Sequence, residues 1–381
     1  MLIDSHAADD MVLNIVFPYT LSEPAYGQRQ PFLADKALMA KYMDAVEAEL
    51  DALDEDLRAR PVQALRLSGG ASIMSADQML HLVKKARKTL SVQPRSQIAV
   101  DVNPLTVGTP SLTDWTSCGV NRVNLNVWSV RDVELKALGA THTRENTQNA
   151  FLFLQKFHMN DVNVRLLYGL PEQTLHSLKE SVQTIAALSY PHVTVLPFVE
   201  PDAKKAAELP GEDEQREMYQ AARELLEKAG YSEYLVGSFV HKGSPHARDG
   251  FDVMQREGAG CLSLGAGARS RYDGFLYENV GVYKTYVAHS ADFQAIVRNP
   301  RSEGADAHQV RLAQGQLDLL ESFTAEELAQ ACGDEALEAT TLAWLYEQVD
   351  AGRLLREDGR YSLSDEGRFQ RAKELGREIL L

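Results

Sequence analysis

An apolar strand followed by a helical pattern recurs along the first 230 residues, and this alternation restricts the possible folds of the chain more than any other feature. Six strands that are each followed by a helix predict a parallel sheet or an open barrel, whose chemistry lies at the carboxyl ends of the strands. We therefore predict an α/β fold built on a partial (β/α)6 barrel. The predicted strands are Leu13–Phe17, Leu65–Ser68, Gln97–Val100, Arg122–Val127, Val162–Leu167 and His192–Phe198.

Beyond residue 230 the alternation weakens, and the pattern predicts a different organisation. We expect a barrel core over residues 1–230, a barrel-capping extension over 231–305 and a winged-helix-like module over 306–381. Leu235–Val240 is predicted as one antiparallel strand, and Asn299–Ala307 as a linker.

The C-terminal module is predicted from its turn and cap residues. Thr324 and Glu327 have the spacing of a capping box, and Asp358-Gly359 is typical of a hairpin turn. Such modules often bind DNA, but a role as a lid or docking element fits an acidic chain better.

A glycine turn follows the second predicted strand. Leu65–Ser72, LRLSGGAS, reads as strand, turn and helix start. Gly69 and Gly70 allow positive φ, and their free N–H groups could donate hydrogen bonds to a carboxylate, a phosphate or the polar end of an amino acid. A tight turn without any ligand needs the same residues, so this motif alone does not decide.

Charge and hydropathy exclude several classes of partner. The net charge of -15 argues against nucleic acid, because phosphate binding needs clustered Lys and Arg. No apolar run approaches the ~20 residues that cross a bilayer, and the first residues lack the pattern of a secretory signal. We expect a cytoplasmic protein with a small-molecule substrate and no membrane partner. The oligomeric state cannot be read from the sequence.

The three cysteines, Cys118, Cys261 and Cys332, lie far apart in the sequence. No pair has the spacing of metal ligands, and an odd number of cysteines favours reduced, buried thiols over disulfides. We predict no metal site.

The order of the strand-end motifs resembles one family, the radical S-adenosylmethionine enzymes of the oxygen-independent coproporphyrinogen III oxidase and heme-chaperone branch. The resemblance covers nearly the whole chain and implies a radical-S-adenosylmethionine-type barrel. The matching motifs are Ser68–Ser72 for Gly-Gly-Gly-Thr-Pro, Asp101–Pro104 for Glu-x-Asn-Pro, Gly119–Val123 with Ser129 for the Gly-Val-Asn-Arg strand, Leu138-Gly139 with His142 for Leu-Gly-Arg-x-His, Tyr168–Pro171 with Gln173-Thr174, and Gly265–Ala268 for the late loop against the adenine.

The chain departs from this family at the iron–sulfur cluster motif. The family has Cys-x-x-x-Cys-x-Tyr-Cys, whose thiolates hold a [4Fe-4S] cluster, whereas Thr20, Pro24 and Gly27 occupy the three cysteine positions here. None of these residues supplies a thiolate, the soft ligand that iron–sulfur clusters use. We therefore expect no [4Fe-4S] cluster and no reductive cleavage to a 5′-deoxyadenosyl radical.

The cofactor pocket implied by the resemblance is also altered. Trp128 replaces a Gln, Ala140 replaces the Arg of Leu-Gly-Arg, and Arg165 replaces an Asp. Arg165 could take over as the partner of the methionine carboxylate. The residues expected to hold S-adenosylmethionine are Tyr26, Gly69, Gly70, Ala71, Asp101, Trp128, Arg165, Phe198 and Arg269.

Three functions follow from this combination. The first is an enzyme that binds S-adenosylmethionine and uses its sulfonium in polar chemistry, namely methyl or aminocarboxypropyl transfer or cyclisation. Asp101, Glu200 and His142 are its candidate bases, and Trp128 could face the sulfonium. Core packing of Trp128 and a structural hydrogen bond of His142 are the alternatives.

The second function is a non-catalytic protein that binds heme or another tetrapyrrole. The third is a conventional radical enzyme, which would require ligands that the sequence lacks. Scattered histidines offer possible heme ligands for the second function, and most of them are expected at the surface. They are His142, His158, His192, His241 and His246.

Overall fold

The computed structural model describes residues 10–20, 32–200, 202–244 and 248–380. Within them, twelve strands form one curved sheet in the order β14-β13-β12-β11-β1-β4-β5-β6-β7-β8-β10-β9. Neighbours from β11 to β8 are parallel, and the strands added at both edges are antiparallel. These strands are β1 (Met11–Phe17), β4 (Pro61–Gly69), β5 (Ser91–Val102), β6 (Arg122–Trp128), β7 (Val162–Tyr168), β8 (His192–Pro197), β9 (Tyr231–Leu235), β10 (Ser238–His241), β11 (Gly260–Leu264), β12 (Arg269–Tyr272), β13 (Phe275–Asn279) and β14 (Val297–Ser302).

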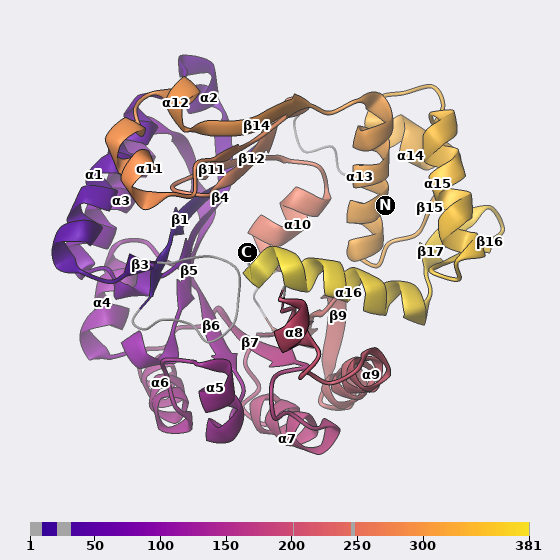
Figure 1. Cartoon of the computed structure of the whole chain (residues 1–381), viewed down its shortest axis with the longest axis horizontal. Coiled ribbons are helices and arrows are strands. Elements are labelled where there is room, and N and C mark those ends of the chain that lie inside the picture. Colours follow the sequence, from indigo (N-terminus) through magenta and orange to yellow (C-terminus); the bar gives the residue numbers. More distant parts are fainter. Residues whose placement is uncertain (1–9, 21–31, 201, 245–247, 381) are drawn as a thin grey trace.

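Figure 1 shows that the sheet curves into an open ring with helices around its outside and α10 (Gly250–Arg256) within it. A separate short ladder pairs β2 (Tyr19–Thr20) with β3 (Phe32–Leu33). Among the described residues, every helix is too short or too polar to cross a bilayer. The other helices of the barrel are α1 (Lys36–Asp51), α2 (Glu55–Ala59), α3 (Ala76–Thr89), α4 (Thr109–Ser117), α5 (Asp132–Leu138), α6 (Arg144–Lys156), α7 (Leu175–Ala186), α8 (Ala203–Ala206), α9 (Glu212–Lys228), α11 (Tyr283–His289) and α12 (Phe293–Ile296).

The six predicted strands correspond to β1 and β4 to β8, and the predicted parallel sheet is confirmed. Two local predictions are wrong. The single strand predicted over 235–240 is the hairpin β9–β10, because Gly237 takes a φ of 76° and turns the chain. The linker predicted over 299–307 instead contains the end of β14 and the start of the next helix.

The two faces of the sheet differ in polarity. On β6, Val123, Leu125 and Val127 are fully buried in the main hydrophobic core, which also holds Leu82 of α3 and Val182 of α7. Alternate side chains of a strand point to opposite faces, so the remaining side chains of β6 point into the ring. The apolar face therefore fixes the helices outside, and the inner face is left for polar groups.

The C-terminal module consists of helices and a small three-stranded sheet, β15-β17-β16. The predicted capping box of Thr324 and Glu327 is present, and the predicted Asp358-Gly359 turn joins two strands. The module has its own small core around Phe323, Leu345 and Tyr361. Its elements are α13 (Ala305–Asp318), β15 (Phe323–Thr324), α14 (Ala325–Cys332), α15 (Ala339–Asp350), β16 (Leu354–Glu357), β17 (Arg360–Leu363) and α16 (Asp365–Leu380).

Helix α16 joins this module to the barrel. A Cβ at Gly376 would lie 2.6 Å from the carbonyl oxygen of Pro197, so the helix packs closely against the end of β8. Arg371 of α16 donates to both carboxylate oxygens of Asp318 at 2.7 and 2.8 Å. Because Asp318 is nearly fully buried, this contact ties α16 to the end of α13.

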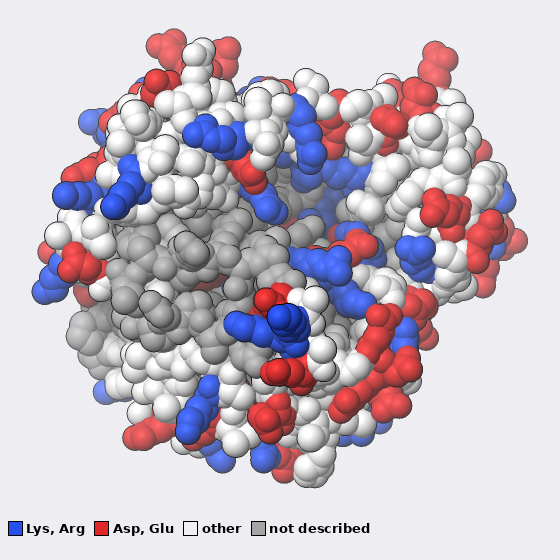
Figure 2. Space-filling view, in the orientation of Figure 1, with Lys and Arg blue, Asp and Glu red and all other residues white. Residues whose placement is uncertain are grey.

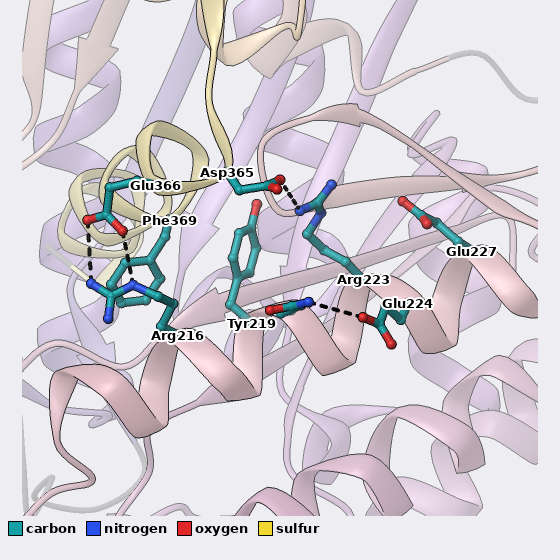
Figure 3. Close-up of a pocket in the computed structure, with 9 residues that line it drawn as sticks. Arg216, Tyr219, Arg223, Glu224, Glu227, Asp365, Glu366 and Phe369 are labelled. Carbon is teal, nitrogen blue, oxygen red and sulfur yellow. Dashed lines mark hydrogen bonds and ion pairs between the residues drawn. The ribbon is translucent and has the colours of Figure 1, made fainter. Parts of the chain in front are cut away.

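A groove of about 260 Å³ lies between α9 and α16. Figure 3 shows that ion pairs cross it, Arg216 with Glu366 and Arg223 with Asp365. The ring of Phe369 packs under Arg216. The charged groups of this groove are largely engaged with one another, so we interpret it as the seam that docks the module on the barrel.

Candidate functional site

Two oppositely charged side chains meet on the inner face of the ring. Asp101, near the end of β5, forms an ion pair with Arg165 of β7, in which Arg165 Nη1 and Asp101 Oδ1 are 3.1 Å apart. Strand β6 lies between them and supplies Asn124, whose amide donates to Asp101 at 2.9 Å, and Asn126, whose oxygen lies 3.3 Å from Arg165. Both charged residues are at least nine-tenths buried. The expected pocket residues Asp101 and Arg165 are thus brought together, and they bind each other.

A ladder of polar side chains continues from this pair across the sheet. Asn163 donates to Asn124 at 3.4 Å, Thr194 donates to Asn163 at 3.1 Å, and the hydroxyls of Thr194 and Ser238 lie 3.2 Å apart. Neighbouring members of a ladder point to the same face of a sheet. The interior of the ring is therefore polar at this level.

Buried charges follow deeper in the ring, where α10 covers its inside. Asp249, the N-cap of α10, lies 3.1 Å from both Arg66 of β4 and Arg122 of β6. Arg122 also pairs with Asp161 at 2.7 Å. Burial disfavours the charged form of Asp249, but Arg122 and Arg66 outweigh it and hold the pKa of this carboxyl below its usual value. These pairs fasten α10 inside the ring.

Trp128 ends β6 in an unusual backbone conformation. Its φ is 61°, which is rare for a bulky residue and costs about 1–3 kcal/mol. The next residue is held firmly, because the Ser129 hydroxyl donates to the buried carboxylate of Glu134 at 2.6 Å. The half-buried Trp128 ring packs against the core, so the structure supports the packing interpretation and leaves part of the ring exposed at the strand end.

The other two candidate bases make contacts of their own. His142 is nearly fully buried, and its Nε2 lies 2.9 Å from the carbonyl oxygen of Val127, beside the end of β6. Burial lowers the pKa of His142, so the neutral ring donates to Val127 and positions that strand end. Glu200 follows β8 and accepts from the backbone N–H of Asp202 at 3.0 Å. Among the described residues, these contacts of His142 and Glu200 involve Val127 and Asp202, and neither contact includes the Asp101–Arg165 pair.

The glycine turn after β4 is explained by packing. The Gly70 N–H donates to the carbonyl oxygen of Phe17 at 2.8 Å, so the expectation that this N–H is free for a ligand is wrong. A Cβ at Gly69 would lie 2.4 Å from Phe17 O, and one at Gly70 would lie 2.6 Å from Tyr19. Ala71 is fully buried at the start of the short helix η1 (Ala71–Ile73). Glycine is therefore required because the end of β1 lies against this turn.

Two of the remaining expected cofactor residues, Phe198 and Arg269, make other contacts. Phe198 is buried in the main core, and its N–H donates to Tyr168 O at 2.7 Å. The Arg269 side chain is 59% exposed and pairs with Glu278 at 3.5 Å. Tyr26 lies outside the described residues, as do Pro24 and Gly27 of the cluster motif.

The late glycine loop is held by a buried carboxyl that we did not predict. Glu49 of α1 accepts from Gly265 N at 2.9 Å, Asn279 Nδ2 at 2.6 Å and the Tyr286 hydroxyl at 2.5 Å. Burial raises the pKa of Glu49 to about 7, although the three donors act to lower it. A Cβ at Gly265, with its φ of 107°, would meet Tyr42 and Val16 at 2.6 Å. Glu49 thus fixes the loop that resembles the adenine-contacting loop.

The sequence did carry a signal for the polar interior. In the β6 sequence RVNLNVW and the β7 sequence VNVRLLY, polar residues recur at every second position within strands that are flanked by helices. This alternation predicts one polar and one apolar face. The missed inner residues include Asn14, whose Oδ1 is buried without a hydrogen-bond partner among the described residues. Within that same part of the chain, no three His, Cys, Asp or Glu side chains converge as a metal site.

Comparison with known proteins gives the class of the fold first. No protein-family model matches the chain. The structure of coproporphyrinogen III oxidase (HemN) from Escherichia coli, a radical SAM enzyme, superposes with a TM-score of 0.80 at 18% identity and covers 98% of this chain and 91% of that one. The chain therefore has the α/β fold of radical S-adenosylmethionine proteins, with a parallel sheet.

Curated relatives narrow this class. The heme chaperone HemW of Lactococcus lactis is 26% identical over 254 residues, which cover 64% of this chain and 66% of the relative. HemW of Bacillus subtilis is 26% identical over 259 residues, which cover 65% of this chain and 67% of the relative. HemW of Escherichia coli is 27% identical over 208 residues, which cover 52% of this chain and 55% of the relative. The chain thus matches between about half and two thirds of these relatives' length. Over that part of its length the chain is similar to the HemW heme chaperones, and its fold resembles that of the radical SAM enzyme HemN.

Proposed function

We propose that this chain is a HemW-like protein that binds heme or a related tetrapyrrole and carries no iron–sulfur cluster. The observation that carries the proposal is a contrast: the relatives are named heme chaperones, whereas Thr20 stands at the first cluster-cysteine position and no thiol can replace it. Thr20 lies in β2 and its carbonyl oxygen accepts from Ala34 N, so its backbone serves the β2–β3 ladder.

The positions of the three thiols support the absence of a cluster. Cys118 packs in the main hydrophobic core, and Cys261 packs with Phe251 in a separate small group of buried apolar residues. Cys332 packs against the core of the C-terminal module. Burial raises the pKa of all three thiols, that of Cys332 to about 11. Since thiolates are the ligands of iron–sulfur clusters, three separate protonated thiols are poor donors.

The state of the strand-end site favours this function over cofactor chemistry. Asp101 and Arg165 neutralise each other, and the Gly70 N–H is taken by Phe17. The groups that the resemblance assigns to the methionine part of S-adenosylmethionine are therefore engaged within the protein, and a ligand would have to displace them.

Of the candidate heme ligands within the described residues, only His158 and His241 have side chains that reach the surface. His142 and His192 are buried and held by Val127 and Asp161. His158 is exposed, and His241 is half-buried beside the ring of Tyr231. His246 lies outside the described residues.

A titration of hemin into the purified full chain tests this function. We expect a saturable Soret band, and a weaker band in His158→Ala or His241→Ala. His81→Ala removes another exposed imidazole and serves as the control, with an unchanged band. A spectrum that remains the sum of free hemin and protein would contradict the proposal.

One observation favours a second candidate, polar chemistry on S-adenosylmethionine. The methionine part of that molecule is a zwitterion, so its amino group could replace Arg165 at Asp101 while its carboxylate binds Arg165. Methyl or aminocarboxypropyl transfer, or cyclisation, would then require a base; Asp101 is the one candidate base that belongs to the pair itself, and Glu200 and His142 are the others. A rise in melting temperature with S-adenosylmethionine, lost in Arg165→Ala, would support this candidate, and no rise would remove it.

A further inference from the structure

Two arginine-bearing strands, β12 and β14, flank β13 at one edge of the sheet. Arg271 of β12 pairs in register with Leu276 of β13, and Leu276 pairs with Arg301 of β14. Directly paired residues point to the same face, and neighbouring strands lie roughly 5 Å apart. The Cα atoms of Arg271 and Arg301 are therefore about 10 Å apart. Their long side chains can reach a single ligand from the same face.

Both arginine side chains lack a partner in the part of the chain that the structure describes. Among the described residues, no hydrogen bond or ion pair is made by the side chain of Arg271 or of Arg301, although the charge of Glu303 acts on Arg271. The neighbouring carboxylates are already occupied: Glu303 pairs with Arg311 at 3.0 Å, and Asp318 pairs with Arg256 at 3.1 Å. Positive charge is in excess here, in a chain whose net charge is -15.

The position of Arg271 makes this excess costly. The side chain is partly buried, and burial together with nearby Arg311 lowers its pKa to about 10. A guanidinium that is partly withdrawn from water and lies near other guanidinium groups is unfavourable unless anions compensate it. An anionic ligand would supply that compensation.

This end of the sheet borders a hollow in the surface of the molecule. Figure 2 shows Lys and Arg side chains gathered in the depression between the β12–β14 end of the sheet and the C-terminal module. Strand β12 forms one side, and α10 with Arg256 and α13 with Arg311 form the other. Helix α13 packs closely on α10, because a Cβ at Gly315 would clash with the carbonyl of Arg256. We call the surface of Arg256, Arg271, Arg301 and Arg311 the arginine hollow.

We propose that the arginine hollow binds a small molecule that bears two carboxylates, with Arg271 and Arg301 as its anchors. Guanidinium groups bind carboxylates in a planar, bidentate manner, and two of them about 10 Å apart at their Cα atoms suit two carboxylates on one framework. A tetrapyrrole with two propionate side chains meets this description. That identification rests on the proposed function, whereas the dicarboxylate site does not.

The test compares the double variant Arg271→Gln/Arg301→Gln with the wild-type chain. Hemin should bind the variant about tenfold or more weakly, since each lost arginine removes a charge-assisted hydrogen bond. Hemin dimethyl ester, which lacks the free carboxylates, should bind the wild-type chain as weakly as hemin binds the variant. The control is Arg95→Gln/Arg144→Gln, which removes two exposed arginines elsewhere and should bind hemin like the wild type. Equal urea midpoints exclude a folding defect.

The outcomes separate the two proposals. Equally tight hemin binding by the wild type and the double variant would overturn the site and leave the heme function intact. If hemin binds neither protein, the proposed heme function is wrong. The dicarboxylate site is then tested separately, by measuring the melting temperature with succinate and with citrate. A rise in melting temperature with these acids, present in the wild type and absent in the variant, supports the site. No rise, or an equal rise with inorganic phosphate, overturns the dicarboxylate assignment.

Discussion

Replacing Asp249 by alanine should lower the free energy of unfolding by roughly 3–5 kcal/mol, because breaking a buried ion pair leaves its partner charge uncompensated. Within the described part of the chain, the fully buried Arg122 would keep one ion pair, with Asp161, and Arg66 would keep one, with Asp252. The variant also loses the N-cap of α10, which costs about 1 kcal/mol. Urea unfolding, followed by circular dichroism, measures the change.

Two further variants isolate the charge of Asp249. Asp249→Asn keeps an oxygen that can cap α10 but removes the charge, so it should recover only the smaller part of the loss. Asp252→Ala removes a partly exposed carboxylate from the same helix and should cost less than Asp249→Ala. A loss below about 1 kcal/mol in Asp249→Ala, the size of the cap alone, would contradict the role of Asp249 as the buried fastening of α10.

The second large effect is a pH dependence that Glu49 introduces. Its pKa is about 7 in the folded chain, compared with 4.5 for an ordinary glutamate. Between these values the folded state keeps a proton that the unfolded state has lost. The stability contributed by this proton is complete below about pH 4.5 and is lost as the pH rises to about 7. At about 1.4 kcal/mol per pH unit, the loss amounts to roughly 3 kcal/mol.

Glu49→Gln provides the matched control, because the amide has a similar shape and does not ionise. We expect the difference in unfolding free energy between the wild type and this variant to favour the wild type more at pH 5 than at pH 8. Subtracting the two curves removes the contribution of every other titrating group that the substitution leaves unchanged. A difference that stays constant from pH 5 to pH 8 would show that Glu49 titrates normally.

Much of the fold could be predicted because local and periodic signals agree with it. The helix start expected after Leu65–Ser72 is present as α3, which begins with a capping box of Ser75 and Gln78. The parallel strands were predictable from their apolar residues. The edge strands were not, because β14, with sequence VRNPRS, has mostly exposed and polar residues and is defined only by its pairing with β13.

The site was predictable in its residues but not in its contacts. Asp101 and Arg165 were both expected at strand ends, yet their pairing depends on the strand order, which places only β6 between them. For Gly69 and Gly70, the local backbone was predictable but the neighbouring segment was not. Their conformation was expected, but the β1 end that occupies the space beside them comes from a segment 50 residues earlier in the chain.

The central claim is that the chain keeps the radical S-adenosylmethionine fold without its cluster. The most direct test is the content of iron and acid-labile sulfide after anaerobic reconstitution of the full chain with iron and sulfide, followed by desalting. We predict no stoichiometric iron or sulfide, because Thr20 and three separate, protonated thiols offer no set of ligands. About four irons and four sulfides per chain, with the broad absorption of a [4Fe-4S] cluster, would contradict this account.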